Sequence, residues 1–290
     1  MDLSRDFIKA KRPCTDGFRW FLRTHQNGGN YQALLDALVR DGRINDACWL
    51  LDQFGPTDAV LRVDSLDAEA IVFAGTIEVR GGIEAGALIR SGRDLVAGGG
   101  IRCDGDIVVG ADLRSDGGVR CDGRLDVSGD ARVAWGIEVE AALSCGGDLR
   151  AEWDLRCKGA MRVDGNIHVG RELIAGAGMR CGKSLFVGGD IACLGDLKAG
   201  NGIQAGAGIA CNGHLEAGWG IRARDDIRAL GAIKAGESLY SGAELQAGEG
   251  YGIYAGLIVQ LEAWEASARV CARTPPARLM SGWWAGPQPC

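Results

Sequence analysis

Proline is missing from the whole stretch between Pro56 and Pro275, although the chain contains six prolines. Proline has no backbone N–H to donate, so it is kept out of the interior of hydrogen-bonded sheets. Its absence over so long a stretch favours a stacked parallel ladder that uses nearly every strand N–H. The prolines lie only toward the two ends, at Pro13, Pro56, Pro275, Pro276, Pro287 and Pro289.

Histidine is also scarce, with only His25, His168 and His214 in 290 residues. Their spacing supports no Ser-His-Asp or Cys-His arrangement, and the chain has no CxxC motif for a metal site. Gly-rich stretches such as residues 98–100 lack the Lys-Ser/Thr pair of a phosphate-binding loop. We therefore expect no catalytic, cofactor-binding or metal-binding residues.

Strong charge and long apolar runs are absent as well. The net charge is −6 and the isoelectric point is near 5.2, which disfavours nonspecific binding to nucleic acids or anionic membranes. The first residues contain no apolar run of signal-peptide length, and no stretch is long enough to span a membrane. These features predict a cytoplasmic protein without a membrane span.

What is present is a six-residue repeat of apolar residues from Ile71 to Leu245. An aliphatic residue or Met stands at every sixth position, and Ala131 is the one exception among thirty positions. A six-residue period fits neither a heptad nor a free amphipathic strand. It predicts a stacked β-solenoid, in which each repeat is one short strand followed by one corner.

The other positions of the repeat agree with this prediction. From Val79 to Ala247, the residue two positions after the aliphatic one is always Ala, Val, Cys or Ser, which would point to the same side of the strand. The next position is Gly in fifteen of twenty-nine repeats, and Asp or Asn in five more. Because these residues tolerate left-handed backbone dihedrals, we expect the corner there.

Three such repeats per coil would give a triangular coil of eighteen residues. The thirty rungs would then form about ten coils, and the rod would be roughly 48 Å long. A flatter, two-sided coil of twelve residues remains an alternative, and the handedness does not follow from the sequence. We favour three sides because six-residue rungs suit a triangle.

Seven of the eleven cysteines occupy the small inward position of the repeat. Buried free cysteine behaves as a small hydrophobic residue, so we interpret them as reduced packing residues of a cytosolic protein. They are Cys103, Cys121, Cys145, Cys157, Cys181, Cys193 and Cys211.

Residues 1–60 differ from the repeats and predict a small helical domain. Asn30 and Asn45 are expected as N-caps, and Gly42 and Gly55 as helix terminators. Since a solenoid exposes an apolar cross-section at each end, this domain is expected to be an N-terminal cap, with docking of a partner as the alternative. The expected helices are residues 17–25, 30–41 and 45–54.

The six-residue phase is also lost after the solenoid, which we place at residues 61–250. Leu257, Val259 and Leu261 alternate, which predicts longer strands in a hairpin over the last coil. Residues 251–290 are therefore expected to be a C-terminal cap with a tail rich in Trp and Pro.

Tryptophans supply the best candidates for an interaction surface. Trp135, Trp153 and Trp219 each occupy the second corner position, and Trp135 and Trp153 are eighteen residues apart. On a three-sided coil these two would lie on adjacent rungs of one edge and could anchor a partner, or simply protect the corner. The tail adds Trp283 and Trp284 to the candidate interaction residues.

The repeat resembles two families. Hexapeptide-repeat acyltransferases share the period, but here the sizes are exchanged, as in Ala85-Gly86-Ala87-Leu88-Ile89. That resemblance implies a catalytic histidine and a loop that interrupts the coils, and the thirty rungs contain no insertion. The uninterrupted rungs over 71–250 resemble bactofilins and related polymer-forming β-helical proteins of bacteria, which implies a cytoskeletal scaffold that joins end to end.

The sequence therefore predicts a mainly β, parallel β-solenoid with a small N-terminal helical domain and a C-terminal cap. We expect a non-catalytic rod without a cofactor. It would self-associate into a homo-oligomer or filament, or dock a protein partner, through its ends and its aromatic edge. The alternatives are an acyltransferase-like enzyme and an acidic mimic that binds a basic partner surface.

Overall fold

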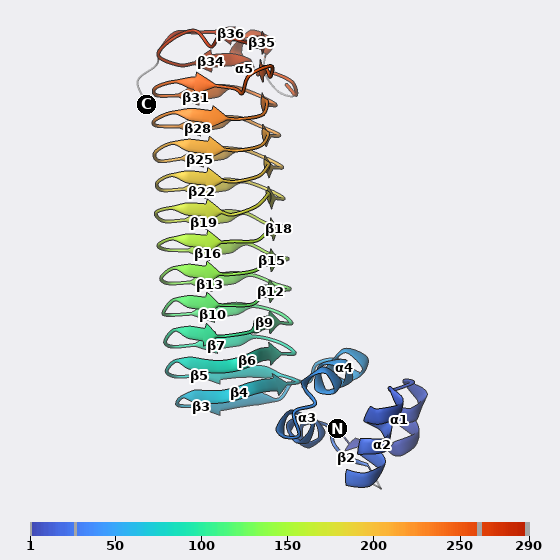
Figure 1. Cartoon of the computed structure of the whole chain (residues 1–290). Coiled ribbons are helices and arrows are strands. Elements are labelled where there is room, and N and C mark those ends of the chain that lie inside the picture. The colour runs from blue at the N-terminus through green and yellow to red at the C-terminus, as the bar shows by residue number, and fades with distance from the viewer. Residues whose placement is uncertain (1, 26–27, 260–262, 288–290) are drawn as a thin grey trace.

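The computed structural model describes all residues except 1, 26–27, 260–262 and 288–290. The chain forms a straight rod with a helical domain beside its N-terminal end (Figure 1). The rod is a parallel β-solenoid of about 12 turns, which confirms the predicted fold class.

Each coil has three faces, and the strands of one face form a continuous 13-stranded sheet. This first face consists of β3 (Val60–Val63), β5 (Thr76–Val79), β7 (Leu95–Ala97), β10 (Leu113–Ser115), β13 (Ala131–Val133), β16 (Leu149–Ala151), β19 (Ile167–Val169), β22 (Leu185–Val187), β25 (Ile203–Ala205), β28 (Ile221–Ala223), β31 (Leu239–Ser241), β34 (Arg269–Cys271) and β36 (Trp283–Trp284).

The second and third faces share one 21-stranded sheet, because β4 (Leu66–Phe73) and β6 (Ile83–Ser91) run across both. The second face continues with β8 (Ile101–Cys103), β11 (Val119–Cys121), β14 (Ile137–Val139), β17 (Leu155–Cys157), β20 (Leu173–Ala175), β23 (Ile191–Cys193), β26 (Ile209–Cys211), β29 (Ile227–Ala229) and β32 (Leu245–Gln246). The third face continues with β9 (Asp106–Val109), β12 (Leu125–Val127), β15 (Leu143–Cys145), β18 (Met161–Val163), β21 (Met179–Cys181), β24 (Leu197–Ala199), β27 (Leu215–Ala217), β30 (Ile233–Ala235), β33 (Ile253–Tyr254) and β35 (Leu279–Ser281).

The strand register fixes the length of a coil. Leu113 pairs with Ala131 on the first face, and Val119 pairs with Ile137 on the second. Each pair is eighteen residues apart, so the coil is three-sided and the two-sided alternative is wrong.

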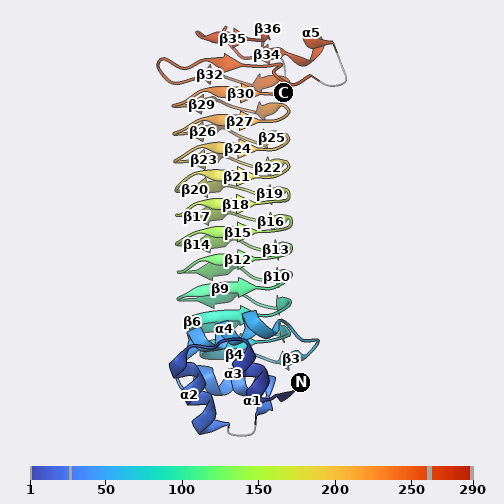
Figure 2. The same cartoon turned by 90° about the vertical axis from the view of Figure 1, so that its right-hand side faces the viewer.

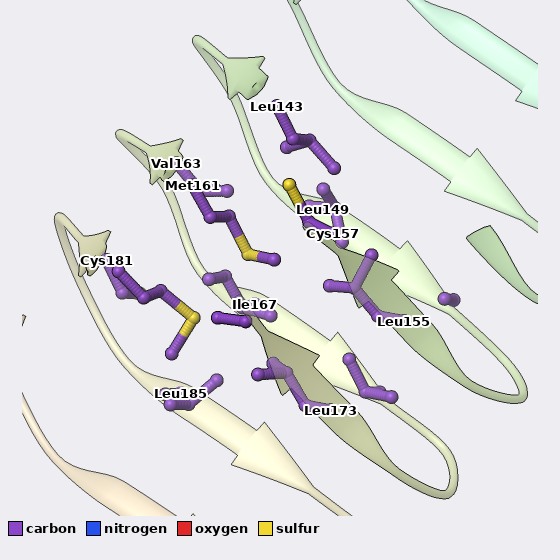
Figure 3. Packing of buried hydrophobic residues seen from close by; sticks show 14 of the residues in the cluster. Leu143, Leu149, Leu155, Cys157, Met161, Val163, Ile167, Leu173, Cys181 and Leu185 are labelled. Atoms are coloured by element: carbon purple, nitrogen blue, oxygen red, sulfur yellow. The ribbon is translucent and has the colours of Figure 1, made fainter. Parts of the chain in front are cut away.

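The interior holds one column of large side chains per face. Leu149, Leu155 and Leu143 come from the three faces of the rod and are at most 1% exposed. Figure 3 shows such side chains pointing into the shared interior, with Met161 and the thiol of Cys157 between them. The aliphatic period was therefore interpreted correctly as the core-forming position.

The expected backbone conformation of the corner glycines is wrong. The corner glycines of the repeats do not have left-handed dihedrals, since the glycines with positive φ all lie outside the regular coils. The reason for glycine is instead the close approach of stacked corners. A Cβ on Gly98 would lie 2.1 Å from the carbonyl oxygen of Arg80 in the preceding coil.

The inward cysteines do more than fill space. The thiol of Cys157 donates a hydrogen bond of 3.2 Å to the carbonyl of Ala141, a corner residue of the preceding coil. Cys121 does the same to Gly105, and the hydroxyl of Ser115 does so to Gly99. Burial raises the pKa of Cys145 to about 11, which keeps this thiol protonated as a donor.

The N-terminal helices are α1 (Arg5–Ala10), α2 (Thr15–Thr24), α3 (Tyr31–Arg40) and α4 (Ile44–Phe54), and a short pair of strands, β1 (Asp2–Leu3) and β2 (Gly29–Asn30), joins them. The Asn30 side chain caps α3, as expected. Asn45 is not a cap, since Arg43 holds that position without a side-chain hydrogen bond. Helix α1 was not predicted; it is six residues long and buries only Ile8.

The helical domain packs against the side of the first coils (Figure 2). Outward-facing residues of the third face, including Val72 and Leu88, join its apolar core. Gln32 of α3 fixes the contact, because its side chain bonds both the carbonyl of Val72 at 3.0 Å and the N–H of Ala74 at 2.9 Å. Arg90 forms an ion pair with Asp52 of α4.

Residues after 250 add further coils. Val270 of β34 pairs with Leu239, and Trp284 of β36 pairs in turn with Val270, always in parallel. These additions, together with β3 and β4 before Ile71, explain why the rod has about 12 turns rather than about ten. Leu257 and Val259 are not in strands, Leu261 lies outside the described residues, and α5 (Trp264–Ser267) follows. No helix of the described residues is long and apolar enough to cross a membrane.

Candidate binding surfaces

A ladder of polar side chains runs along the corner between the third and first faces. Each member stands just before an inward aliphatic residue and accepts the backbone N–H of the residue eighteen positions later. Asp130, for example, accepts the N–H of Asp148 at 2.9 Å. The ladder consists of Asp94, Asp112, Asp130, Asp148 and Asn166, and Asn166 accepts from Ser184.

One member of the ladder, Asp148, has an altered pKa. The N–H and the side-chain amide of Asn166 both bond the carboxylate of Asp148, and Lys183 and His168 lie near it. These donors lower the pKa of Asp148 below its ordinary value, despite partial burial. The hydrogen bonds to Asp148 are therefore strongest when its carboxylate is ionised.

A groove begins on this corner where the ladder ends. The next positions are Gly202, Gly220 and Ser238, which carry no side chain long enough to fill the space. Together with Ser184 they form the floor of a groove with a volume of about 490 Å³. We call it the C-terminal groove.

Aromatic residues line both walls of the C-terminal groove. Trp219 stands on the corner side, while Phe186 and Tyr240 stand in the outward row of the first face. The guanidinium of Arg222 lies 5.9 Å from the ring centre of Tyr240, and His168 stacks on Phe186 at 4.9 Å. At its upper end the groove meets α5, where the Ser238 hydroxyl donates to the carbonyl of Ser267.

A second groove of about 510 Å³ lies on the corner between the first and second faces, and we call it the N-terminal groove. Its floor is also made of glycines, namely Gly82, Gly100, Gly118 and Gly136. Trp135 lines it on one side. Charged residues line the other side, where Arg120 lies 3.4 Å from Glu138.

The candidate tryptophans therefore belong to three places. Trp135 and Trp153 stack at 5.8 Å on adjacent coils, as the spacing predicted, and Arg171 continues the stack over Trp153 at 5.5 Å. Trp219 lies on a different corner. It follows Trp135 by 84 positions in the sequence, which is not a multiple of the eighteen residues in one coil.

Trp283 and Trp284 form the last strand of the rod and are about 40% exposed. Their indole N–H groups bond carbonyls of the coil beneath, at Glu265 and Ala272.

The sequence reasoning missed the grooves themselves. The signal was available as glycines eighteen residues apart at the position before the aliphatic residue, where Asp stands in other coils. This signal is weak, because glycine is also common at the corner position of the repeat.

The histidines do not come together. His168 stacks on Phe186, while the Nδ1 atom of His214 accepts the N–H of Ala232 at 3.0 Å on another corner. His25 lies in the helical domain against Trp20 and Phe21. Within the described residues, no group of three or more His, Cys, Asp or Glu could hold a metal ion.

The two ends of the rod differ from its middle. Among the described residues, β3 pairs only with β5 and β4 only with β6, so the first coil has free strand edges. Four aliphatic residues of that coil remain partly exposed at the end of the core: Leu61, Val63, Ala68 and Ile71. The last coil ends in β35 and β36, with Leu279 partly exposed.

The helical domain contains an apolar hollow of about 400 Å³. Trp20, Phe21 and Trp49 line it, with Cys14 and Asp46 at its polar side. The Cys14 thiol lies 3.6 Å from a carboxylate oxygen of Asp46.

Comparison with known proteins touches only the helical part. Residues 1–54 match the family described as the YdhT N-terminal domain, and the match ends where α4 ends. No curated protein and no solved structure matches the chain.

Proposed function

We propose that this protein is a non-catalytic structural protein, a rigid rod that self-associates end to end. One observation carries the proposal: no described residue pairs with the outer edges of β3 and β4, which lie beside four partly exposed aliphatic residues of the core. Free edges of this kind are templates for pairing with another strand. An isolated solenoid end is normally covered for that reason.

The helical domain supports this proposal by its position. It lies beside the first coils, and the region directly below β3 is open in Figure 1. Its core is shared with the outward residues Val72 and Leu88 rather than with the inward Leu61 or Val63. A second copy could therefore approach the end of the rod along its axis.

The other end of the rod is the complementary surface. Leu61 and Trp284 are the first and last members of one inward column on the first face, as successive pairings show. Stacking the last coil of one copy under the first coil of the next would continue the parallel sheet. Trp284 would then cover Leu61 as Ile77 covers it from the other side.

A non-enzymatic role in the bacterial cytoplasm is part of the proposal. His168 and His214 are each engaged by a neighbouring ring or N–H, as described above, which favours a structural part for both. None of the ten described cysteines is in a disulfide, and Cys193 stands in register beside Cys211 without forming one. Free thiols in such pairs suit a reducing compartment.

The test is the assembly state of the full chain, measured by sedimentation velocity and electron microscopy. The double variant Leu61→Lys/Ile71→Lys charges the open end and should give monomers, while Trp284→Ala should weaken assembly from the other end. Leu194→Lys, at an aliphatic residue that is 60% exposed on the flank, is the matched control. A wild-type chain that stays monomeric at high concentration would refute the proposal.

A further inference from the structure

The floor of the C-terminal groove offers hydrogen-bond donors without acceptors. The backbone N–H groups of Gly202, Gly220 and Ser238 bond no described residue, because the ladder that serves this position has ended. The carbonyl groups of these three residues already accept hydrogen bonds from the preceding coil. The donors are the N–H groups of Leu185, Ile203 and Ile221, in that order. A ligand that fits this floor must bring acceptors and need not bring donors.

The walls of the groove add apolar surface and further donors. Trp219, Phe186 and Tyr240 supply aromatic faces on both sides. Gln204 and Arg222 stand next to each other in the same row, between Phe186 and Tyr240, so two donors lie between the two rings. Glu237 also lines the groove and forms no ion pair with a described residue.

We propose that the C-terminal groove binds a proline-rich protein segment in the polyproline II conformation, flanked by a basic residue. Proline has carbonyls but no N–H, so its backbone is the acceptor-only partner that the floor requires. Its rings pack on aromatic walls, which is how proline-rich segments are recognised. The carboxylate of Glu237, which forms no ion pair with a described residue, is the place for the basic residue.

The dimensions support this class of ligand. One turn of polyproline II is about 9.3 Å long, and two coils of the rod rise about 9.6 Å. Residues on one side of the ligand would therefore meet every second coil of the groove. An extended β-strand repeats each face about every 6.8 Å, which does not match, and it would bring N–H donors to a donor floor.

This inference extends the proposed interaction role from the ends of the rod to its side, and either can fail without the other. Its probe is a fluorescent peptide of six prolines between two arginines, titrated with the full-length chain and followed by anisotropy. The matched control peptide replaces the prolines by alternating Gly and Ser and keeps both arginines. Sedimentation of each variant reports assembly separately.

The sharpest variant is Gly202→Asn, which should extend the ladder into the groove. A Cβ at Gly202 would meet only the carbonyl oxygen of Gly220, at 3.4 Å, so the substitution fits. The new side chain would accept the N–H of Gly220, as Asn166 accepts that of Ser184. Thermal unfolding should show no loss of stability, while the affinity for the proline peptide should fall about tenfold or more.

Two other substitutions separate the walls. Trp219→Ala should lower the affinity for the proline peptide about tenfold, and Glu237→Gln should lower it about threefold. The controls Trp135→Ala and Gly100→Asn, in the N-terminal groove, should leave this affinity unchanged. Equal binding of both peptides, or unchanged affinity in Trp219→Ala, would overturn the proposal. Absence of peptide binding would also overturn the proposal. Binding of a neutral oligosaccharide such as cellohexaose in place of the peptide would not rescue it.

Discussion

In the solenoid, a buried side chain such as Leu149 packs between residues eighteen positions before and after it, Ala131 and Ile167. In the helical domain, Leu35 is equally buried, but its neighbours come from helices and strands with no fixed spacing. The rod is therefore a sum of similar contacts between neighbouring coils, as in other repeat proteins. The helical domain depends instead on a single core and on one lateral contact with the rod.

Truncation of a matched pair of buried leucines should give the largest effect. Leu149→Ala and Leu35→Ala each remove a side chain that is 0% exposed, so each should cost about 3 kcal/mol of local stability. Hydrogen exchange should show Leu149→Ala loosening the coils on both sides, and Leu35→Ala loosening only the helices. Leu194→Ala, at an exposed site, is the control and should change stability by less than about 0.5 kcal/mol. Uniform loosening of the whole chain by Leu35→Ala would contradict the comparison.

The contact between the two regions should be the next most sensitive. Gln32→Ala leaves the carbonyl of Val72 and the N–H of Ala74 without their partner, which should cost about 2 kcal/mol at this interface. Limited proteolysis should then release the helical domain while the coils stay protected. Gln204→Ala, on the flank of the rod, should leave the proteolysis pattern unchanged. Intact protection of the helices in Gln32→Ala would show that the apolar contacts alone hold them.

Inside the rod, the thiols should contribute less. Cys157→Ala removes the hydrogen bond to Ala141 as well as some packing, and should cost about 1 kcal/mol in chemical denaturation. Cys157→Ser restores a donor and should recover part of that loss. Cys271→Ala is the comparison for volume alone, because its buried thiol donates no hydrogen bond to a described residue. Equal losses in Cys157→Ala and Cys157→Ser would mean that packing accounts for the effect.

The sequence predicts the repeats of the solenoid well and the parts of the chain outside them poorly. Leu149 and Leu155 could be assigned to the core because their environment is set by residues at a constant spacing. Val270 and Trp284 could not, since Val270 pairs with Leu239 across 31 residues rather than eighteen. The side contact of Gln32 with Val72 depends on how two domains meet, which no local pattern reports.

The candidate surfaces show the same limit. The stacking of Trp135 on Trp153 followed from the eighteen-residue spacing. The C-terminal groove did not, because it exists only where the polar ladder stops at Ser184 and two glycines follow. An absence of side chains gives a weaker signal in a glycine-rich sequence than a tryptophan does.

The polar ladder should give the smallest effect, and it depends on pH. The hydrogen bonds from Asn166 lower the pKa of Asp148 in the folded rod below the ordinary value of about 3.9. A carboxylate with a depressed folded pKa stabilises the fold above its unfolded pKa and loses that contribution as the pH falls through the folded value. Unfolding experiments between about pH 2 and pH 6 should therefore show the chain losing stability below about pH 4.

Asp148→Asn keeps an oxygen that can accept the N–H of Asn166 but cannot titrate, so the stability of this variant should fall less steeply over the same range. Asp126→Asn, at an exposed-row position of the third face outside the ladder, is the control and should follow the wild-type curve. The helical domain contains no such ladder among its described residues, so Asp148→Asn should change the acid response of the rod and not that of the helices. An acid curve for Asp148→Asn that is identical to the wild type would remove Asp148 from this account.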